Sequence, residues 1–286
     1  MPTSPNKPRI AFLGPLGTFS YEAVIAHFGG DVEPVASPSI PAVFENVARG
    51  DADQGVVPIE NSIEGGVNFT QDTLLETQLS LCGEIMVDVE QCLLSNAVER
   101  SRIERVYSHP QGLAQCRKWL ARNLPNATLV PTASTVQAAH LVAGDATAAA
   151  VASRLAARLA GVTVVEGAIQ DQASNVTRFV VLGSAEQRTR PTGNDKTSLV
   201  FSTRDERGAL VRALTLFDRA GINLCRIESR PRTGEAWQYV FFVDLEGHLD
   251  DDNVREALRA LQGHAELEGQ SDMVKVFGSY PRARAK

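Results

Sequence analysis

The chain has 286 residues, 43% of them hydrophobic and 22% charged, with a formal charge of −6. This composition is typical of a globular protein with room for two or three domains. An acidic chain without a basic stripe argues against a nucleic-acid partner. The polar first eight residues are not a signal peptide, and no apolar run approaches the roughly 18 residues of a membrane span. The four scattered cysteines lack CxxC spacing, which is typical of reduced core thiols in a cytoplasmic protein.

The first third of the chain alternates predicted strands and helices, which favours a largely parallel sheet. The segments are strand 9–13, glycine-rich turn 14–17, helix 21–28, strand 32–36, helix 40–48, strand 55–57 and helix 67–78. We expect Pro58 to end its strand and to open a polar loop that reaches Gly66. Polar loops that follow strands lie where α/β sheets bind ligands.

Two longer strands, 85–87 and 91–94, indicate a crossing into a second lobe. A short strand at 106–107 then leads to helix 110–123, near whose start Gln111 and Gln115 share one face. Beside the Ser108 hydroxyl, these amides either form a donor cluster for an oxyanion or are simply solvated, and His109 is expected to cap the helix. The remaining segments are strand 128–130, helix 135–142, strand 148–151, helix 153–159 and strand 162–165.

The chain returns at 170–175 to the strand Ser-Asn-Val-Thr-Arg-Phe-Val-Val, residues 174–181. Because side chains alternate along a strand, Thr177 and Phe179 share one face while Arg178 takes the other. A hydroxyl beside an aromatic ring suits a small, ring-shaped substrate that carries oxygen. The alternative is a plain strand entry, with the threonine capping a turn and the arginine in solvent.

A polar segment at 187–196 indicates a linker, and the pattern beyond it changes to βαββαβ, a ferredoxin-like unit. Its segments are strand 198–201, helix 208–219, strand 222–227, strand 238–243, helix 252–261 and strand 273–277. We expect the second strand to break at Glu-Ser-Arg-Pro, residues 228–231, ahead of a turn at 233–234. Sheets of this kind often dimerise and bind small effectors at their joints.

Six motifs, in this order along the chain, together resemble the family of monofunctional prephenate dehydratases with a C-terminal ACT regulatory domain. They are Gly-Pro-Leu-Gly-Thr at 14–18, Pro-Ile-Glu-Asn-Ser at 58–62, Ser-His-Pro-Gln-Gly-Leu-Ala-Gln-Cys at 108–116, Asn-Val-Thr-Arg-Phe at 175–179, Gly-Ala-Leu at 208–210 and Glu-Ser-Arg-Pro at 228–231. Gly112 departs from the family, in which Ala or Phe-like residues are common. No chorismate mutase region precedes Arg9, so that activity is not expected.

The resemblance implies an α/β protein with a two-lobed catalytic domain like a type II periplasmic binding protein, followed by a ferredoxin-like ACT domain. The catalytic domain would cover residues 1–186, with lobe one at about 8–81 and 170–184 and lobe two at about 82–169. The linker would cover 187–196 and the ACT domain 197–280. The active site is expected in the cleft between the lobes.

The family converts prephenate to phenylpyruvate, carbon dioxide and water, with no cofactor or metal. By resemblance, Thr177 donates the proton or positions its donor, and Glu60 is the second candidate acid. Substrate oxygens would be oriented by Asn61, Ser108, Gln111 and Gln115, and the substrate would also be contacted by Thr18, Glu60, Ser62, Arg178 and Phe179. Arg178 faces away from Thr177 in a regular strand, so either the strand is distorted or Arg178 braces the cleft indirectly.

The resemblance further implies that L-phenylalanine is an allosteric effector, bound at a subunit junction of a homodimer or homotetramer. The candidate effector residues are Gly208, Ala209, Leu210, Asn223, Glu228, Ser229, Arg230 and Pro231. The bland alternative for 228–230 is an exposed polar turn. We expect residues 1–186 alone to keep activity and lose feedback. The rival function is an amino-acid sensor without chemistry, but Thr177 together with the amides is a denser polar set than such a sensor requires.

Overall fold

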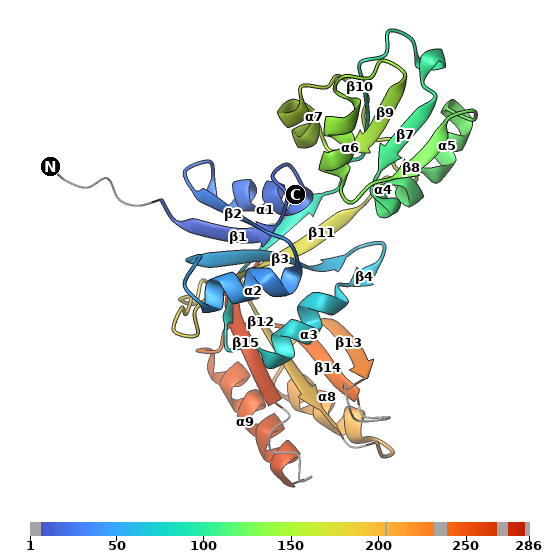
Figure 1. Cartoon of the computed structure of the whole chain (residues 1–286). Helices are drawn as coiled ribbons and strands as arrows, with labels where there is room; N and C mark the ends of the chain where they lie inside the picture. Colours follow the sequence, from blue (N-terminus) through green and yellow to red (C-terminus); the bar gives the residue numbers. More distant parts are fainter. Residues whose placement is uncertain (1–6, 204, 232–238, 268–273, 284–286) are drawn as a thin grey trace, which may run out of the picture. The chain divides into compact units, whose positions relative to one another are not determined.

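The computed structural model describes residues 7–203, 205–231, 239–267 and 274–283, with side chains up to 263 in the third of these ranges. Three sheets are present in the part of the chain so described (Figure 1). The first has the order β2-β1-β3-β11-β5, with the short strand β4 paired to β3. Its strands are β1 (Arg9–Leu13), β2 (Glu33–Ser37), β3 (Gln54–Asn61), β4 (Gly65–Gly66), β5 (Ser80–Asp88) and β11 (Val176–Gly183).

The second sheet has the order β10-β6-β9-β7-β8. Its strands are β6 (Cys92–Ser95), β7 (Arg105–Ser108), β8 (Thr128–Pro131), β9 (Ala148–Ala152) and β10 (Val164–Glu166). In the first sheet β11, the last strand of its lobe, lies between β3 and the edge strand β5, and in the second sheet β6, the first strand of its lobe, lies between β9 and the edge strand β10. Two sheets joined by two chain crossings give the two-lobed α/β arrangement expected from the sequence.

Alternating side chains of the second sheet build two separate cores, as strand geometry requires. Ala148 and Ala150 of β9 pack with α6 (Thr135–Val142) and α7 (Arg154–Ala160) on one face. Ala149 and Val151 pack on the other face with Leu120 of α5 (Arg117–Asn123). Because both faces are covered, β9 is apolar throughout and fully buried.

The helices of the first lobe are α1 (Phe19–Phe28), α2 (Ile40–Ala48) and α3 (Asn68–Glu76). Helix α1 begins at the N-cap Thr18, whose Oγ1 accepts a hydrogen bond from the backbone N of Tyr21 at 3.4 Å. It ends at Gly29, whose φ of +76° is in the left-handed region that glycine adopts without strain.

The third sheet has the order β13-β14-β12-β15, the antiparallel order of a ferredoxin-like fold. Its elements are β12 (Asp195–Ser202), α8 (Ala209–Arg219), β13 (Leu224–Pro231), β14 (Tyr239–Glu246), α9 (Asp252–Leu267) and β15 (Val274–Pro281). Leu199 and Phe201 of β12 pack with Phe217 of α8 and Leu261 of α9 in one core. This sheet is the ACT-like unit that the βαββαβ pattern predicts.

Four sequence-based expectations about the elements are wrong. Strand β3 continues through Pro58 to Asn61, because the fixed φ of proline suits an extended chain and only one donor is lost. Strand β5 belongs to the first sheet, so the crossing into the second lobe follows Asp88. The helix predicted at 110–123 is two helices, α4 (Pro110–Gln115) and α5, because Cys116 leaves helical geometry with a ψ of 12°.

The fourth correction concerns β13, which does not break at residue 228 but runs on to Pro231. Strand β13 lies at the edge of its sheet, where proline is tolerated because it need not donate to a neighbouring strand. The turn expected at 233–234, and the strand starts expected at 238 and 273, lie outside the described residues.

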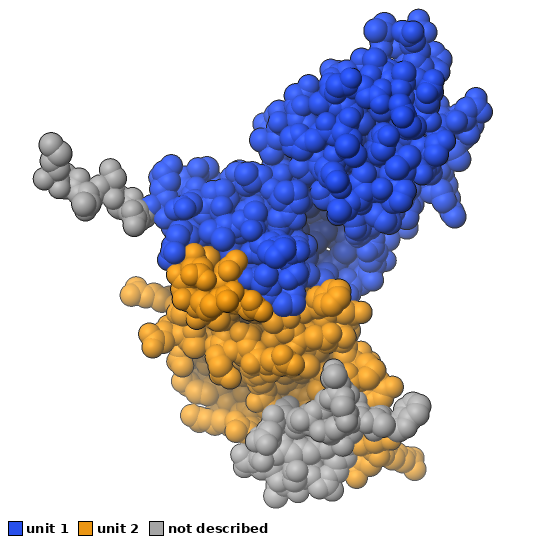
Figure 2. Space-filling view, viewed as in Figure 1, with its two compact units in different colours: residues 1–43, 56–67, 85–179 blue, residues 44–55, 68–84, 180–286 orange. Residues whose placement is uncertain are grey.

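The chain divides into two compact units (Figure 2). Unit 1 consists of residues 1–43, 56–67 and 85–179, and unit 2 of residues 44–55, 68–84 and 180–286. Unit 2 therefore combines the third sheet with helix α3 and part of β5. A cut after residue 186 removes most of this unit and leaves residues 44–55, 68–84 and 180–186 of it in place; that residues 1–186 keep activity and lose feedback stays a prediction.

A buried ion pair lies inside unit 2. Lys196 Nζ is 2.7 Å from Glu84 Oε2, with side-chain exposures of 7% and 1%, and Glu84 Oε1 also accepts a hydrogen bond from the backbone N of Ala283 at 2.9 Å. Two charges removed from water are stable only while they remain paired.

Glu84→Ala is expected to lower the free energy of unfolding by about 3–5 kcal/mol, because it leaves the Lys196 ammonium buried without its carboxylate. Denaturant unfolding measures this loss. Replacing both partners, as Glu84→Leu with Lys196→Met, should recover most of the stability. Glu45→Ala, which removes an exposed carboxylate, serves as the control and should change stability by less than about 0.5 kcal/mol. Equal effects of Glu84→Ala and Glu45→Ala would contradict the buried pair.

All four cysteines are free. Burial raises the pKa of the Cys82 and Cys92 thiols to about 11 and that of Cys116 to about 12, so these groups are unreactive at neutral pH. Cys225 is exposed on edge strand β13, which corrects the expectation that every cysteine is a core residue. None of the helices in the described ranges is long and apolar enough to cross a membrane.

Candidate active site

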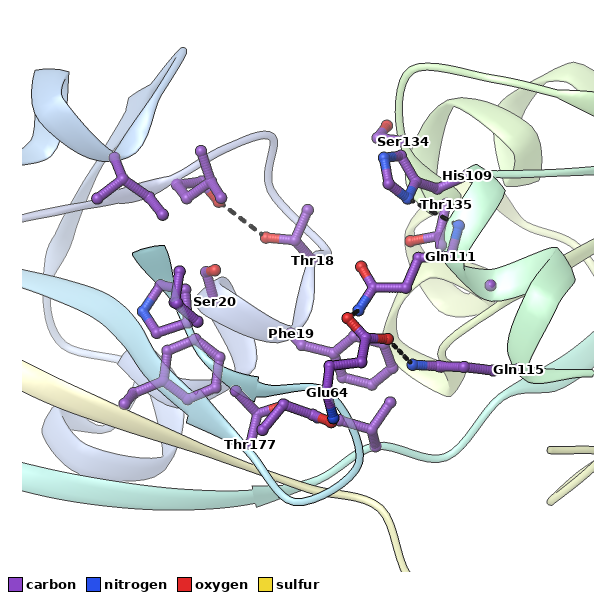
Figure 3. Close-up of a pocket in the computed structure, with 18 of the residues that line it drawn as sticks. Thr18, Phe19, Ser20, Glu64, His109, Gln111, Gln115, Ser134, Thr135 and Thr177 are labelled. Carbon is purple, nitrogen blue, oxygen red and sulfur yellow. Dashed lines mark hydrogen bonds between the residues drawn. The ribbon is translucent and has the colours of Figure 1, made fainter. Parts of the chain in front are cut away.

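Unit 1 contains a pocket of about 480 Å³ that is lined by residues of both lobes (Figure 3). The first lobe contributes the turn after β1, the loop after β3 and the start of β11. The second lobe contributes the starts of helices α4 and α6. Six predicted site residues line this pocket: Thr18, Asn61, Gln111, Gln115, Thr177 and Phe179. The structure therefore brings together motifs that are up to 161 positions apart in the sequence, from residue 18 to residue 179.

Three helices begin at the pocket, each with a lining residue at its N-cap. Thr18 caps α1, His109 caps α4 through Nδ1 at 3.3 Å from the backbone N of Gln111, and Ser134 caps α6 through Oγ at 3.0 Å from that of Gln137. Helix N-termini carry partial positive charge and favour anions. Of the described residues that line the pocket, none is a lysine or arginine. An anion in this pocket is therefore met by dipoles and neutral donors.

The Thr177 hydroxyl is held by an amide of the facing strand. Asn61 Nδ2 donates to Thr177 Oγ1 at 2.9 Å and to Asn175 Oδ1 at 2.8 Å. The same side chain accepts through Oδ1 from the backbone N atoms of Ile63 and Glu64, at 2.9 and 3.1 Å. Asn61 is 8% exposed and its amide orientation is fixed on both sides. Because Thr177 Oγ1 accepts from Asn61, its own proton is available to a group in the pocket.

Glu64 is a pocket residue that the sequence analysis does not single out. Its Oε2 accepts from Gln111 Nε2 at 2.6 Å and its Oε1 from Gln115 Nε2 at 3.1 Å (Figure 3). Gln115 is also held from the other side, by Gln91 Nε2, which donates to its Oε1 at 3.1 Å. Ser134 and Thr135 are further pocket residues that no sequence motif indicated. Their only signal is the N-cap serine ahead of an apolar helix.

Four predicted site residues lie outside the lining. Ser108 is fully buried and donates from Oγ to the carbonyl of Val151 at 2.6 Å. A Cβ on Gly112 would lie 2.5 Å from this Oγ, which explains why glycine stands there. Ser62 Oγ accepts from the backbone N of Val176 at 2.9 Å and joins the loop after β3 to the start of β11.

The other two residues outside the lining form an ion pair. Arg178 is 5% exposed, and its Nε lies 3.3 Å from Glu60 Oε2. Thr177 and Phe179 line the pocket while Arg178 does not, as the alternation along a regular strand predicts. Of the two alternatives for Arg178, this geometry favours an indirect brace between β3 and β11. It also engages Glu60, the second candidate acid, away from the pocket.

The candidate effector residues form two groups. Gly208 precedes α8 with a φ of +83° and without a side-chain cap, Ala209 is buried, and Leu210 is half-buried. Asn223 is exposed, and its hydrogen bond to Glu246 lowers the pKa of that carboxyl. Helix α8 has 11 residues, and its N-terminus, which has no side-chain cap, offers backbone N–H groups to a carboxylate.

Glu228 and Arg230, the charged members of the second group, bind helix α3 of the same unit. Glu228 Oε2 accepts from Gln71 Nε2 at 2.7 Å. Arg230 Nη1 donates to Asn68 Oδ1 at 2.6 Å and to Gln71 Oε1 at 2.9 Å, and its Nη2 lies 2.9 Å from Asp72 Oδ1. The residues are therefore not an exposed polar turn.

Helix α3 is held at its other end as well. Lys275 Nζ donates to the carbonyls of Leu74, Leu75 and Thr77 at 2.9, 2.9 and 2.5 Å. A cation at the C-terminus of a helix is favoured by the helix dipole. Burial lowers the pKa of Lys275, whereas the three carbonyl oxygens are acceptors suited to its ammonium form.

Residues 10–187 match the sequence model of prephenate dehydratase, and residues 197–263 match that of the ACT domain. The chain belongs to the prephenate dehydratase family. A bifunctional chorismate mutase/prephenate dehydratase of Aquifex aeolicus is 44% identical over 278 residues, which cover 97% of this chain and 75% of that protein. A prephenate dehydratase of Mycolicibacterium smegmatis is 38% identical, with 97% of this chain and 92% of that protein covered.

The dehydratase and ACT domains also have a solved counterpart. The structure of a prephenate dehydratase of Arthrobacter aurescens in complex with L-Phe has a TM-score of 0.86 and 35% identity. The match covers 96% of this chain and 90% of that chain. The two parts of the chain thus match two separate family models and one solved relative that contains L-Phe.

Proposed function

We propose that the pocket of unit 1 is the site at which this prephenate dehydratase acts, with Thr177 as the proton donor. The observation that carries the proposal is the Thr177 hydroxyl, which accepts from Asn61 at 2.9 Å in a pocket fringed by helix N-termini. In the reaction, the bond between the ring and its carboxylate breaks and releases carbon dioxide. The electron pair moves through the cyclohexadiene and expels the ring hydroxyl, which takes a proton and leaves as water.

The pocket suits this electron flow. Prephenate is a dianion, and the helix starts at Thr18 and Ser134, with the amides of Gln111 and Gln115, supply neutral donors for its carboxylates. A cation held against the departing carboxylate would stabilise the ground state more than the transition state and slow the reaction. Phe179 offers an apolar face to the ring, and Asn61 holds the Thr177 hydroxyl in one orientation.

The direct test is turnover of prephenate by the purified protein, followed as phenylpyruvate absorbance in alkali. We expect phenylpyruvate to form at a rate proportional to enzyme concentration, without added metal or cofactor. The amino-acid sensor, the rival function from the sequence analysis, would bind an amino acid and leave prephenate unchanged. No turnover by folded protein would overturn the proposal.

We also propose that L-phenylalanine regulates the enzyme through the ACT domain. The uncapped start of α8 at Gly208, together with Ala209, Leu210 and Asn223, supports an effector site, because backbone N–H groups suit the carboxylate of the amino acid. The edge strand β13 exposes Ile227, which supports pairing with a second copy and hence a homodimer or homotetramer. The Arthrobacter relative bound to L-Phe supports the choice of effector.

Transmission of the signal is assigned to helix α3. Glu228 and Arg230 hold this helix, and its first residue, Asn68, follows directly on Val67 of the pocket. A shift of β13 on effector binding would therefore be passed on by helix α3 to the segment that follows Asn61, the last residue of β3. Ser229 and Pro231 belong to the same strand and complete the motif.

The proposed domain boundaries are those of the sequence analysis: catalytic residues 1–186, linker 187–196 and ACT residues 197–280. The ranges that match the two family models support them. The free cysteines, all four with pKa values raised by burial, support a location in the reducing cytoplasm.

A further inference from the structure

The Glu64 carboxylate is bound by two side-chain amides of the second lobe. It accepts from the side-chain amides of both Gln111 and Gln115, at 2.6 and 3.1 Å, at the wall of the pocket (Figure 3). These two amides are the donors that the proposed function assigns to a substrate carboxylate. One carboxylate cannot take the same two protons while another holds them.

The loop that carries Glu64 lets its side chain move while its backbone stays in place. Residues 62–64 form the short loop between β3 and β4, with Asn61 paired to Gly65. The backbone N of Glu64 is held by Asn61 Oδ1 at 3.1 Å. The side chain itself is exposed, so its carboxylate can turn into solvent and be hydrated at little cost.

The Gln115 amide does not depend on Glu64 for its orientation. Gln115 Oε1 accepts from Gln91 Nε2 at 3.1 Å, and Gln91 is 3% exposed, so the Gln115 amide keeps its direction when Glu64 leaves. Gln111 and Gln115 also lie in the same helix, α4. The Gln115 amide is thus preorganised for an anion, and Gln111 lies one helical turn before it.

We propose that Glu64 is a stand-in for the substrate: its carboxylate binds the amides of Gln111 and Gln115 in the empty pocket and is displaced by a carboxylate of prephenate. This inference rests on the proposed function of the pocket. Glu64 is a negative charge in a pocket that must admit a dianion, so it opposes binding twice, by occupying the donors and by like-charge repulsion. It sets affinity and takes no part in proton transfer.

The test is steady-state kinetics of Glu64→Ala and Glu64→Gln on the full chain, with Glu45→Ala as a control for the change of net charge. We expect Glu64→Ala to lower KM for prephenate about three- to thirtyfold, the range set by the loss of one competing charge-assisted contact. The value of kcat should change less than about threefold. Glu64→Gln, which keeps an acceptor oxygen and loses the charge, should fall between Glu64→Ala and the unsubstituted protein.

A second readout without turnover is the affinity for phenylpyruvate, measured by calorimetry. Its carboxylate should also bind more tightly to Glu64→Ala than to the unsubstituted protein, whereas Glu45→Ala should match the latter. An unchanged or raised KM in Glu64→Ala, with prephenate turnover intact, would overturn the stand-in and leave the proposed function standing. A fall in kcat of more than about 100-fold in Glu64→Ala would also overturn the stand-in, because it would identify Glu64 as the proton donor.

Discussion

Replacing Thr177 by alanine is expected to lower kcat for prephenate by about 10²–10⁴-fold, the usual range for the loss of a positioned proton donor. The change in KM should be smaller, since the hydroxyl acts on the leaving group in the transition state. The reason lies in the hydrogen bond from Asn61 Nδ2, which occupies a lone pair of Thr177 Oγ1 and leaves the hydroxyl proton for the substrate. Steady-state kinetics on prephenate measures both parameters.

Two further variants separate the hydroxyl from its neighbours. Thr177→Ser keeps the hydroxyl and should lose far less activity than Thr177→Ala. Equal losses in these two variants would assign the effect to the methyl group and remove the proton-donor role. Glu60→Gln examines the competing acid, which the structure engages with Arg178 at 3.3 Å. A larger loss of kcat in Glu60→Gln than in Thr177→Ala would reverse the assignment.

Replacing Arg230 by alanine is expected to abolish most of the inhibition by phenylalanine while leaving phenylalanine bound. Arg230 contacts Asn68, Gln71 and Asp72, so its loss weakens the hold of β13 on the first turn of α3, which then rests on the bond between Glu228 and Gln71. Allosteric couplings typically amount to 5–150-fold. In Arg230→Ala, saturating phenylalanine should lower kcat/KM by less than about twofold, although its dissociation constant should stay within about threefold of that of the unsubstituted protein.

Arg255→Ala is the matched control, because Arg255 lies in α9 and forms an exposed ion pair with Asp252 of the same helix. It should keep both inhibition and phenylalanine affinity. Calorimetric titration of phenylalanine, run beside the kinetics, separates binding from coupling. If Arg230→Ala loses phenylalanine binding itself, Arg230 belongs among the effector ligands and the role of α3 is wrong.

Local sequence rules predict much of this fold because the relevant physics is local. Apolar runs place the strands, and the expected cap at His109 marks the start of α4, whereas α1 begins at Phe19, two residues before its predicted start. The ferredoxin-like sheet follows from one βαββαβ pattern. The strand ends are less predictable. Proline at Pro58 and Pro231 predicts a break, but the sheet position of each residue decides whether a missing donor matters.

The candidate site is predictable only where a motif and its geometry agree. Thr177 and Phe179 share the pocket face because alternation along β11 is regular. Ser108 shows the limit: its motif is a site motif, yet its hydroxyl is buried against the carbonyl of Val151. Glu64 shows the converse limit, because it lines the pocket although no sequence motif includes it. Its partners lie 47 and 51 positions away, so no local pattern signals the contact.

The central claim is that Asn61 and Thr177 act as one unit in proton transfer. A double-mutant cycle tests it: kcat for prephenate is measured for Asn61→Ala, Thr177→Ala and the double variant. If Asn61 works only by holding the Thr177 hydroxyl, the double variant should be as slow as Thr177→Ala alone, within about threefold. Losses that multiply, so that the double variant is slower by the product of the two single effects, would contradict the account.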